Sequence, residues 1–479
     1  MSPLSLNPLL LLFALLCACG AQPEPLPTLT RAQLLDPATC AACHPDQYRD
    51  WLASAHAHAA EDPVFLAMNR RGQRETSGKL GNFCIQCHAP MAVREGATKD
   101  GLNLDQLPQH LHGVTCYFCH SVQEVGGSHN NPLQLATDLL LRGPIANPMA
   151  NTAHRSEYST LHDRDRLESA KLCGACHDVV TPAGAALERT LIEWQASVFS
   201  HAPGGTTCSQ CHMPQSSTPR PIASVPGAPL RRTHSHQFPG VDVPTGTDAQ
   251  AASQVIQALL DTTVQSAVCV TTSGAPHLEV ILDNVAAGHS FPSGASLDRR
   301  LWVEIIAYQA GQPIYQSGTA LPGDPSAAND SDLWLLRDCI RDAAGQPVHM
   351  FWQAAQASGN ALPGQATFDP SDPRYYQTHV LARFPQTGAL AALPDRVTVR
   401  VRLQAIGLDM LDSLVQSGDL DPAVRDAMPT WQLGKTLEWT PASATKTFTR
   451  DGVTRSCATH TNLDPAADTV PATRLPCAP

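Results

Sequence analysis

An alternation of apolar and polar positions marks the second half of the chain. Residues 277–282 (HLEVIL), 301–308 (LWVEIIAY) and 397–403 (VTVRVRL) each repeat with a period of two, and a shorter candidate at 313–316 follows a turn at Gly311. A period of two places successive side chains on opposite faces, as in a half-buried strand. Several short strands bounded by turns predict a β-sandwich-like domain here.

The first half lacks this alternation and contains stretches with helical spacing. Residues 41–60 place Trp51, Ala55 and Ala59 on one face, which predicts a helix. The chain also has 40 prolines and only 5% aromatic residues, which indicates many loops. Further helices are expected at 152–170, 186–199, 249–260 and 410–417, and an extended linker at 214–244.

The sequence Cys-x-x-Cys-His occurs five times between residues 40 and 212. With 16 cysteines and 20 histidines in 479 residues, chance would supply only about 0.02 copies. This motif attaches c-type haem: two thiols form thioethers with the vinyl groups, and the histidine becomes the proximal iron ligand. The attachment cysteines are Cys40, Cys43, Cys84, Cys87, Cys116, Cys119, Cys173, Cys176, Cys208 and Cys211, and the proximal histidines are His44, His88, His120, His177 and His212.

Two other readings of the paired cysteines are available. Zinc ribbons use two Cys-x-x-Cys pairs per metal but need no histidine directly after the second cysteine. A disulfide framework would suit an exported chain, yet it leaves the five histidines unexplained. We therefore expect five covalently bound c-type haems as the cofactors.

Fifteen histidines lie outside the motifs, an ample supply for five distal iron ligands. A distal histidine would give a low-spin, low-potential haem, whereas methionine would raise the potential. Met91 and Met213 follow motif histidines too closely to reach over their own haem. The distal candidates are His56, His289, His154, His236 and His129; His234 competes with His236, and His58, His112 and His162 compete with His129.

Four cysteines outside the motifs suggest two disulfides in an exported protein, with three possible connectivities. We expect Cys457–Cys477, which closes a short loop, and by elimination Cys269–Cys339, for which free buried thiols are the alternative. Residues 298–300 (Asp-Arg-Arg) are either salt-bridging surface residues or partners of haem propionates.

The N-terminus predicts export. Residues 9–16 form an apolar run too short to span a bilayer, typical of a signal peptide. Leu16-Cys17-Ala18-Cys19 looks like a bacterial lipobox, which implies cleavage before Cys19 and lipid attachment there; the region before it lacks Lys and Arg, and an ordinary signal peptide is the alternative. No other segment reaches transmembrane length. The localisation expected is the bacterial periplasm or cell surface.

Together these features predict an α+β multidomain protein. The expected units are a lipoprotein signal peptide (1–19), a linker (20–36), a haem-packed, loop-rich and helical domain (37–240), a linker with a helix (241–260), a β-sandwich-like domain (261–450) and a C-terminal tail (451–479). About 35 residues per motif is too little peptide for a core of its own, so the haems must supply apolar packing and lie close together. The net charge of −11 disfavours nucleic acid and suits partners with a basic face.

The segment from Cys40 through His44-Pro45, Tyr48, Trp51 and Ser54-Ala55-His56 resembles the first haem site of a superfamily of multihaem c-type cytochromes. That superfamily includes the tetrahaem cytochrome of ammonia oxidisers, pentahaem nitrite reductase and hydroxylamine oxidoreductase. The resemblance extends over residues 37 to about 440, because residues 284–294 look like a histidine loop of β-domains appended to such cytochromes. It implies that His56 serves a neighbouring haem.

Catalytic members of that superfamily differ from this chain. Pentahaem nitrite reductases carry their active haem on Cys-x-x-Cys-Lys, which is absent here, and hydroxylamine oxidoreductases have eight motifs. We therefore expect an electron carrier with mostly bis-histidine haems and no catalytic residues. The alternatives are an oxidoreductase acting on a small nitrogen or sulfur compound at one open haem, and a sandwich that mainly docks a partner. The partners expected are redox proteins, possibly in a membrane complex, and the membrane through the lipid anchor.

Overall fold

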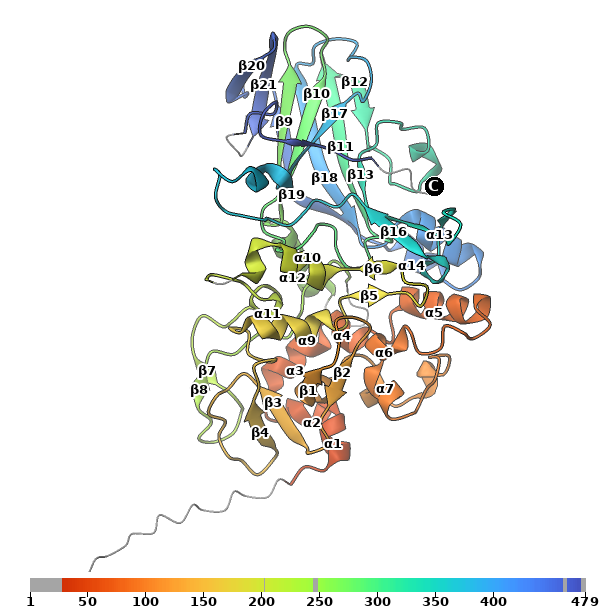
Figure 1. Cartoon of the computed structure of the whole chain (residues 1–479), viewed down its shortest axis with the longest axis vertical. Coiled ribbons are helices and arrows are strands. Elements are labelled where there is room, and N and C mark those ends of the chain that lie inside the picture. Colours follow the sequence, from red (N-terminus) through yellow and green to blue (C-terminus); the bar gives the residue numbers. More distant parts are fainter. Residues whose placement is uncertain (1–27, 202, 244–248, 460–462, 475–479) are drawn as a thin grey trace, which may run out of the picture.

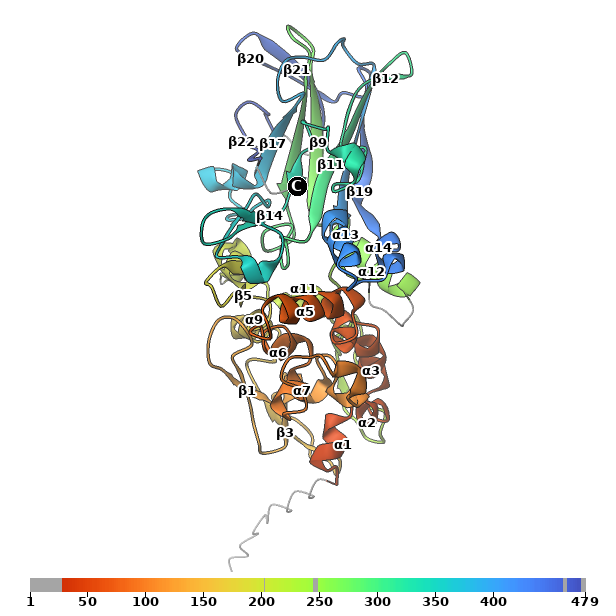
Figure 2. The same ribbon diagram turned by 90° about the vertical axis from the view of Figure 1, so that its right-hand side faces the viewer.

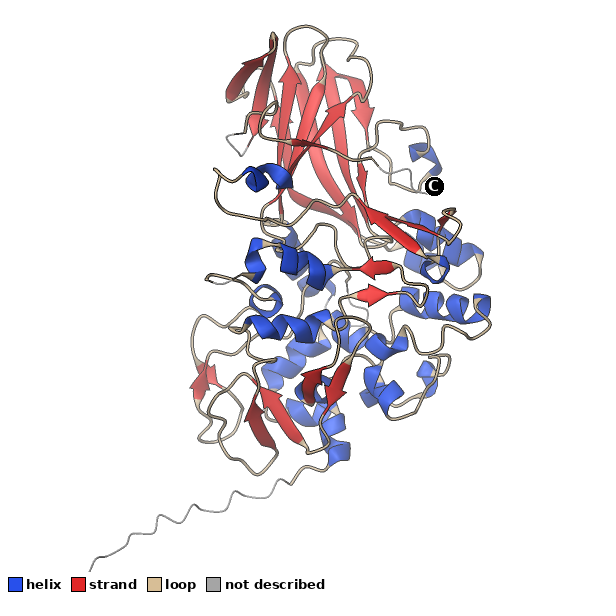
Figure 3. Cartoon of the chain, viewed as in Figure 1, coloured by secondary structure: helices blue, strands red, loops and turns tan. Residues whose placement is uncertain are grey.

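The computed structural model arranges the chain as two regions along its long axis (Figure 1). It describes residues 28–201, 203–243, 249–459 and 463–474. The chain up to residue 243 forms a region of short helices and small hairpins, and the strands from residue 264 onward form a region of long strands (Figure 3). The mixed helix and strand content predicted from the sequence is therefore confirmed.

The first region is built from many short elements. Its α-helices are α1 (Arg31–Leu35), α2 (Pro37–Ala41), α3 (Pro45–Leu52), α4 (Ala55–His58), α5 (Pro63–Glu75), α6 (Ile85–His88), α7 (Pro90–Arg94), α8 (Cys116–His120), α9 (Ala170–Gly174), α10 (Thr190–Ala196) and α11 (Cys208–His212). Its strands are β1 (Val122–Val125), β2 (Leu133–Leu135), β3 (Leu140–Gly143), β4 (Arg155–Tyr158), β5 (Val179–Val180), β6 (Ala186–Glu188), β7 (Arg220–Pro221) and β8 (Leu230–Arg231), and its 3₁₀ turns are η1 (Leu104–Gln106), η2 (Gln109–Leu111), η3 (Leu167–Ser169) and η4 (Val198–Ser200).

Prolines divide this region into short helices. Helices α2, α3, α5 and α7 each begin on a proline, which fits the first turn but cannot continue a helix from its interior. The single helix predicted over residues 41–60 is therefore wrong, because Pro45 and the turn at Ala53 divide it. The helix predicted over 152–170 is replaced by β4 and η3, and that over 186–199 shortens to α10 between β6 and η4.

The second region contains helices α12 (Ala249–Leu260), α13 (Leu408–Gln416) and α14 (Pro422–Asp426) and the 3₁₀ turns η5 (Pro325–Ala327), η6 (Phe351–Gln353) and η7 (Pro373–Thr378). Its strands are β9 (Val264–Thr271), β10 (Leu278–Asn284), β11 (Arg300–Gln309), β12 (Gln312–Ser317), β13 (Leu335–Leu336), β14 (Asp338–Arg341), β15 (Pro347–Val348), β16 (Gln356–Gly359), β17 (His379–Phe384), β18 (Arg396–Gln404), β19 (Thr430–Trp439), β20 (Lys446–Arg450), β21 (Val453–Thr459) and β22 (Val470–Pro471). All four strands predicted from alternation are present, as β10, β11, β12 and β18.

These strands form two principal sheets. One has the order β20-β21-β9-β10-β17-β22, and the other has the order β12-β11-β18-β19 with β13 beside β11. Every pairing in them is antiparallel except that of β17 with β22. A smaller sheet, β15-β14-β16, lies toward the first region (Figure 2).

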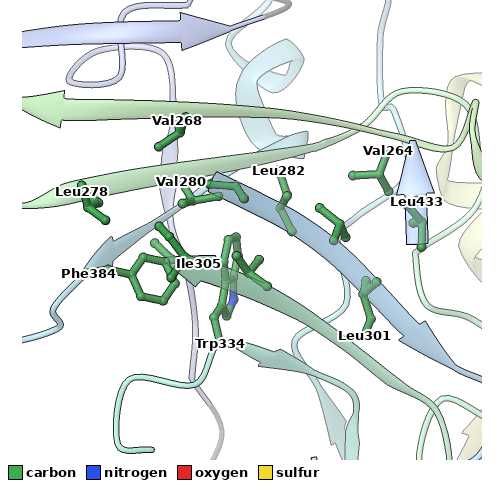
Figure 4. Close-up of a cluster of buried hydrophobic side chains, with 14 of the residues drawn as sticks. Val264, Val268, Leu278, Val280, Leu282, Leu301, Ile305, Trp334, Phe384 and Leu433 are labelled. Carbon is green, nitrogen blue, oxygen red and sulfur yellow. The ribbon is translucent and has the colours of Figure 1, made fainter. Parts of the chain in front are cut away.

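The two sheets enclose a common apolar core (Figure 4). Val280 and Leu282 of β10 are fully buried, as are Ile305 of β11 and Phe384 of β17. Complete burial of side chains of this size contributes about 1.5–3 kcal/mol each. The predicted β-sandwich is thus supported by a core shared between facing sheets.

The sandwich continues beyond residue 450, where a C-terminal tail was predicted. Strand β21 lies between β20 and β9 inside the six-stranded sheet. It opposes β9 with Cys457 directly across from Cys269, and these two cysteines form a disulfide. The expected Cys457–Cys477 and Cys269–Cys339 pairs are therefore wrong, because strand register rather than closeness in sequence brings the thiols together. Cys339 is also disulfide-bonded, and Cys477 lies outside the described residues.

The two regions are joined through helix α5. Its apolar face, with Val64 and Ala67, packs against Leu411 and Leu414 of α13. Two turns further along the same helix Arg74 donates two hydrogen bonds to Asp419, at 2.7 and 2.6 Å. The packed helices fix the sandwich over the first region, so that loops of the sandwich reach the same interior as the motifs.

Candidate functional site

All five Cys-x-x-Cys-His motifs open onto one connected cavity. Its volume is about 2380 Å³, which is several times the roughly 300–1,000 Å³ of an ordinary small-molecule pocket. The ten motif cysteines are free thiols, each of them lines this cavity, and so do the five motif histidines. One space of this size, bordered by five attachment motifs, fits several large apolar groups held by covalent bonds.

Each motif adopts a helical turn that brings its chemistry to one side. The backbone N–H of the histidine donates to the carbonyl of the first cysteine, as in His44 to Cys40 at 2.8 Å and His177 to Cys173 at 3.1 Å. Thr115 and Thr207 cap the third and fifth motif helices through their hydroxyls. The turn therefore presents two thiols and an imidazole toward the same part of the cavity.

The motif histidines are oriented by backbone carbonyls. For four of them the ring Nδ1 lies at hydrogen-bond distance from a carbonyl of another segment, which fixes the tautomer and leaves Nε2 free for a metal. These pairs are His44 with Ile222 (3.1 Å), His88 with Ala59 (3.0 Å), His120 with Arg142 (2.6 Å) and His212 with Pro239 (2.8 Å). Sequence reasoning did not find these carbonyl partners, because a backbone carbonyl carries no residue-type signal.

Two predicted distal histidines face motif histidines. The ring centroids of His154 and His44 are 6.3 Å apart, and those of His56 and His177 are 6.2 Å apart. Two imidazoles on opposite sides of one iron lie about 6 Å apart by ring centre, given metal–nitrogen bonds of about 2 Å. Burial lowers the pKa of His56 to about 3 and that of His177 to about 4, so both rings are neutral and keep a lone pair for a metal.

His289 reaches the cavity from the sandwich. Its Nδ1 lies 2.7 Å from the Ser290 carbonyl, and Asn284 holds the loop by donating to the His289 carbonyl at 2.8 Å. The ring is buried, which lowers its pKa to about 4, and it lies within electrostatic range of His212 and His177. The sandwich therefore contributes an imidazole to the cavity, as the sequence predicts.

His236 also lines the cavity, with its Nδ1 3.1 Å from the His234 carbonyl. Burial lowers the pKa of His236 to about 4, and the nearest other imidazoles that act on it are those of His120, His234 and His44. His234 itself lies 3.2 Å from Gln215. His236, with its Nε2 free, is thus placed near the third motif.

The structure does not bring His129 into the cavity. It is exposed and contacts Ser128, because the loop after β1 turns outward. His162 is half-buried and stacks on His120 with 5.7 Å between ring centroids. Its Nε2 contacts the Cys119 carbonyl at 2.8 Å, whereas its buried Nδ1 has no partner among the described residues.

Two other histidines that compete for the distal iron position already contact Glu61. His58 contacts Glu61 and the Leu52 carbonyl, and His112 contacts Glu61 and the Leu104 carbonyl. Because both ring nitrogens of each histidine are in use, neither ring offers a nitrogen to the cavity.

Thiols of different motifs lie side by side. The Cys40 thiol of the first motif and the Cys116 thiol of the third each alter the pKa of the other, and the Cys87 thiol of the second motif raises the pKa of Cys176 in the fourth. The Cys173 thiol of the fourth motif and the Cys208 thiol of the fifth likewise alter each other's pKa. Thiols of the third and fourth motifs also interact electrostatically. The motifs are therefore neighbours in space, and the fourth motif lies at the centre of the group.

His88 of the second motif has different surroundings. Phe65 of α5 stacks on its ring with 4.2 Å between centroids and 5° between planes. Among the ring pairs in the described ranges, none joins His88 to a second histidine, in contrast to His44 with His154 and His177 with His56. Asp62 and Asp242 act electrostatically on His88, and Asp62 caps α5 through the Phe65 N–H at 2.7 Å.

The two arginines of the Asp-Arg-Arg segment after the His289 loop have different surroundings. Arg299 lines the cavity and donates to the Ser293 carbonyl at 2.9 Å. Arg300 is buried and pairs with Asp409 at 2.6 Å, so the surface interpretation of Arg300 is wrong. The strand period explains this, since successive residues at the start of β11 face opposite sides.

The donor set fits haem better than zinc. Zinc needs about four Cys or His ligands around one point. Within the described ranges there is no group of three or more His, Cys, Asp or Glu side chains that could hold a metal ion. The thiols instead occur in pairs beside a histidine, which is what covalent haem attachment requires.

A family model described as "Cytochrome c554 and c-prime" matches residues 39–121. This span contains the first three motifs. No match to a curated protein was found. The motifs, the cavity and this match support the same class, a multihaem c-type cytochrome.

The fold has a particular likeness among solved structures. The crystal structure of a penta-heme cytochrome c552 from Thermochromatium tepidum matches with a TM-score of 0.58 and 20% sequence identity, over 85% of this chain and 99% of that chain. The likeness covers both regions of the fold. In the part of the chain that the structure describes, no helix is long and apolar enough to cross a membrane. The expected signal peptide and the expected lipidation site Cys19 lie outside the described residues.

Proposed function

We propose that this chain is an exported electron-transfer protein that holds five covalent c-type haems. The observation that carries the proposal is the close approach of thiols from different motifs within one cavity. When bound, haem iron alternates between the ferric and ferrous states, which is the chemistry of electron transfer. The residues of the chain would hold the haems and keep the imidazoles in fixed orientations.

Histidines on the far side of the cavity complete the proposed ligand sets. We pair His154 with His44 and His56 with His177 on their ring separations. His289 serves the centre of His212, its nearest motif histidine by electrostatic interaction. The remaining member, His236, is assigned to His120 and takes precedence over His162, whose Nε2 is held by the carbonyl of the same motif.

The thiol contacts define a proposed route for electrons. The first motif leads to the third and the third to the fourth, and from the fourth the route continues to the second and to the fifth. The partners proposed are redox proteins with a basic docking face, because the chain carries a net charge of −11. Attachment of haem to this motif is consistent with export, and lipid on Cys19 would hold the protein at a membrane.

Haem content tests this function directly. A pyridine haemochrome assay combined with the intact mass of the exported protein should give five haems per chain. Two or fewer haems would overturn the proposal. Replacing Cys84 and Cys87 by Ser should lower the count by one, and replacing the disulfide partner Cys269 by Ser is the control that should leave it at five.

A second function has a specific observation in its favour. Phe65 stacks on His88, and among the described residues no second imidazole makes a ring contact with His88, although His88 acts electrostatically on His56. An iron held by His88 alone would leave one position open to a small molecule, as an oxidoreductase for nitrogen or sulfur compounds requires. EPR of the oxidised protein distinguishes the two functions. A high-spin signal that changes with nitrite or hydroxylamine supports the enzyme, and purely low-spin signals support the carrier.

A further inference from the structure

Glu188 is a carboxylate on the cavity wall that the ligand sets do not use. It ends β6, in the hairpin that follows the fourth motif, and its half-buried side chain lines the cavity. Among the described residues it has no hydrogen-bond or ion-pair partner. A carboxylate in such a place is costly when charged, and burial raises the pKa of Glu188 to about 7.

The charged groups that face Glu188 come from three segments. Arg299 favours its charged form, whereas Asp298, Asp242 and Asp178 disfavour it. Arg299 and Glu188 both border Gly294: a Cβ built on that glycine would lie 3.5 Å from Nη2 of Arg299 and 4.0 Å from Oε2 of Glu188. Gly294 has a φ of +71°, a conformation that costs glycine little, so the backbone approaches both side chains closely.

Arg299 connects this pair to the centre of the fourth motif. Its charge acts on His177 and on His289, and its own ion pair with Asp242 is long, at 3.6 Å. The charge of Glu188 and the charge of the His177 centre therefore lie within range of the same guanidinium. A change of charge at one of them is felt at the other through a poorly solvated interior.

From this arrangement we propose that Glu188 is a redox-linked proton site, which binds one proton when an electron arrives at the centre held by His177. The proposal rests on the function proposed above, since it requires a bound haem. The balance is simple: a reductant gives one electron to the ferric centre, and the carboxylate of Glu188 takes one proton from solvent and becomes a neutral acid. The added negative charge is cancelled, so the electron is stabilised more at low pH than at high pH.

Glu193 offers a matched control. Burial raises its pKa to about 7 as well, and it lies on α10, five residues further along. Its carboxylate, however, accepts a hydrogen bond from Ser293 at 2.6 Å, and it is not among the residues that line the cavity. Glu193→Gln thus removes a similar acid from the neighbourhood without touching the site.

The experiment measures proton uptake on complete reduction of the holoprotein by dithionite or at an electrode, between about pH 6 and 8. Glu188→Gln should lower the uptake by up to one proton per chain. It should also weaken the pH dependence of the midpoint reduction potential of one haem. For one proton per electron, that dependence is up to about 59 mV per pH unit. Glu188→Asp should retain both effects, and Glu193→Gln should leave both close to wild type.

Unchanged uptake in Glu188→Gln would overturn the proposal, as would an equal loss in Glu193→Gln. Haem content is measured on every sample. A chain that lacks its haems defeats the function proposed above, whereas five haems with unaltered proton uptake defeat only the role of Glu188. Because glutamine has nearly the same shape and removes a buried acid, we expect the variant to fold.

Discussion

Removing the carboxylate of Asp409 should destabilise the sandwich strongly. Asp409, on α13, accepts from Arg300 at 2.6, 2.8 and 3.2 Å, and Arg337 adds a longer contact at 3.5 Å. The Arg300 side chain is only 1% exposed, so Asp409→Ala leaves a buried charge without its counter-charge. Breaking such a pair costs about 3–5 kcal/mol. For a domain of about 200 residues this lowers Tm by roughly 10 °C.

Thermal unfolding followed by calorimetry on the holoprotein measures this loss. Asp412→Ala is the control, because Asp412 lies on the same helix and pairs with Arg425, with both side chains about one-third exposed; exposed pairs contribute only about 0–1 kcal/mol. A Tm decrease below about 3 °C for Asp409→Ala would refute the reasoning. Such a result would mean that water or a neighbour compensates Arg300.

The pH dependence of the same pair has a definite sign. Burial alone would raise the pKa of Asp409, but the charge and hydrogen bonds of Arg300 outweigh it and hold the pKa below its ordinary value. The stability from the pair is therefore complete above the unfolded pKa, about 3.9, and is lost as the pH falls through the lower folded pKa. The difference in the free energy of unfolding between wild type and Asp409→Ala should stay constant from pH 5 to 8. It should become smaller below about pH 4.

Three further outcomes are expected. His289→Ala should convert one low-spin haem to high-spin in EPR while five haems stay attached. The control variant His129→Ala should leave the EPR spectrum unchanged. An unaltered spectrum in His289→Ala would remove His289 from the ligand set. Cys19→Ser should release haem-stained protein into the soluble fraction, and continued membrane association would contradict lipid attachment at that residue. The double variant Cys269→Ser/Cys457→Ser should lose roughly 2–4 kcal/mol of stability in oxidising buffer, measured by denaturant unfolding. Equal denaturation midpoints for wild type and variant would contradict this prediction.

The sequence predicts the site better than the fold around it. The attachment motifs depend on local spacing, so a one-turn helix suffices to place two thiols and a histidine, and all five motifs lie on the cavity. The long strands β11 and β18 are likewise visible in the sequence. Burial alternates along β18 as its sequence pattern does, whereas the first six residues of β11 are all buried. Helices α12 and α13 also lie within two residues of their predicted bounds.

Contacts between segments far apart in the sequence could not be predicted from residue spacing. The loop with His129 and the segment with His162 look equally suitable in sequence, and only packing turns the first outward and places the second on the cavity wall. The disulfide depends on the register of β9 and β21, which are separated by 188 residues. Helical periodicity over 41–60 was overridden by a proline and by turns that serve the motif.

The sandwich is part of the wall around the motifs, and this has a consequence for biogenesis. His289, Ile406 and Met428 line the cavity from the C-terminal half, whereas every attachment motif precedes residue 213. A chain delivered from its N-terminus presents all ten motif thiols before the closing wall exists. For the haems proposed above, attachment at the motifs would therefore precede folding of the sandwich, which closes the cavity. In such an order of assembly, a slow-folding C-terminal half protects maturation of the N-terminal half.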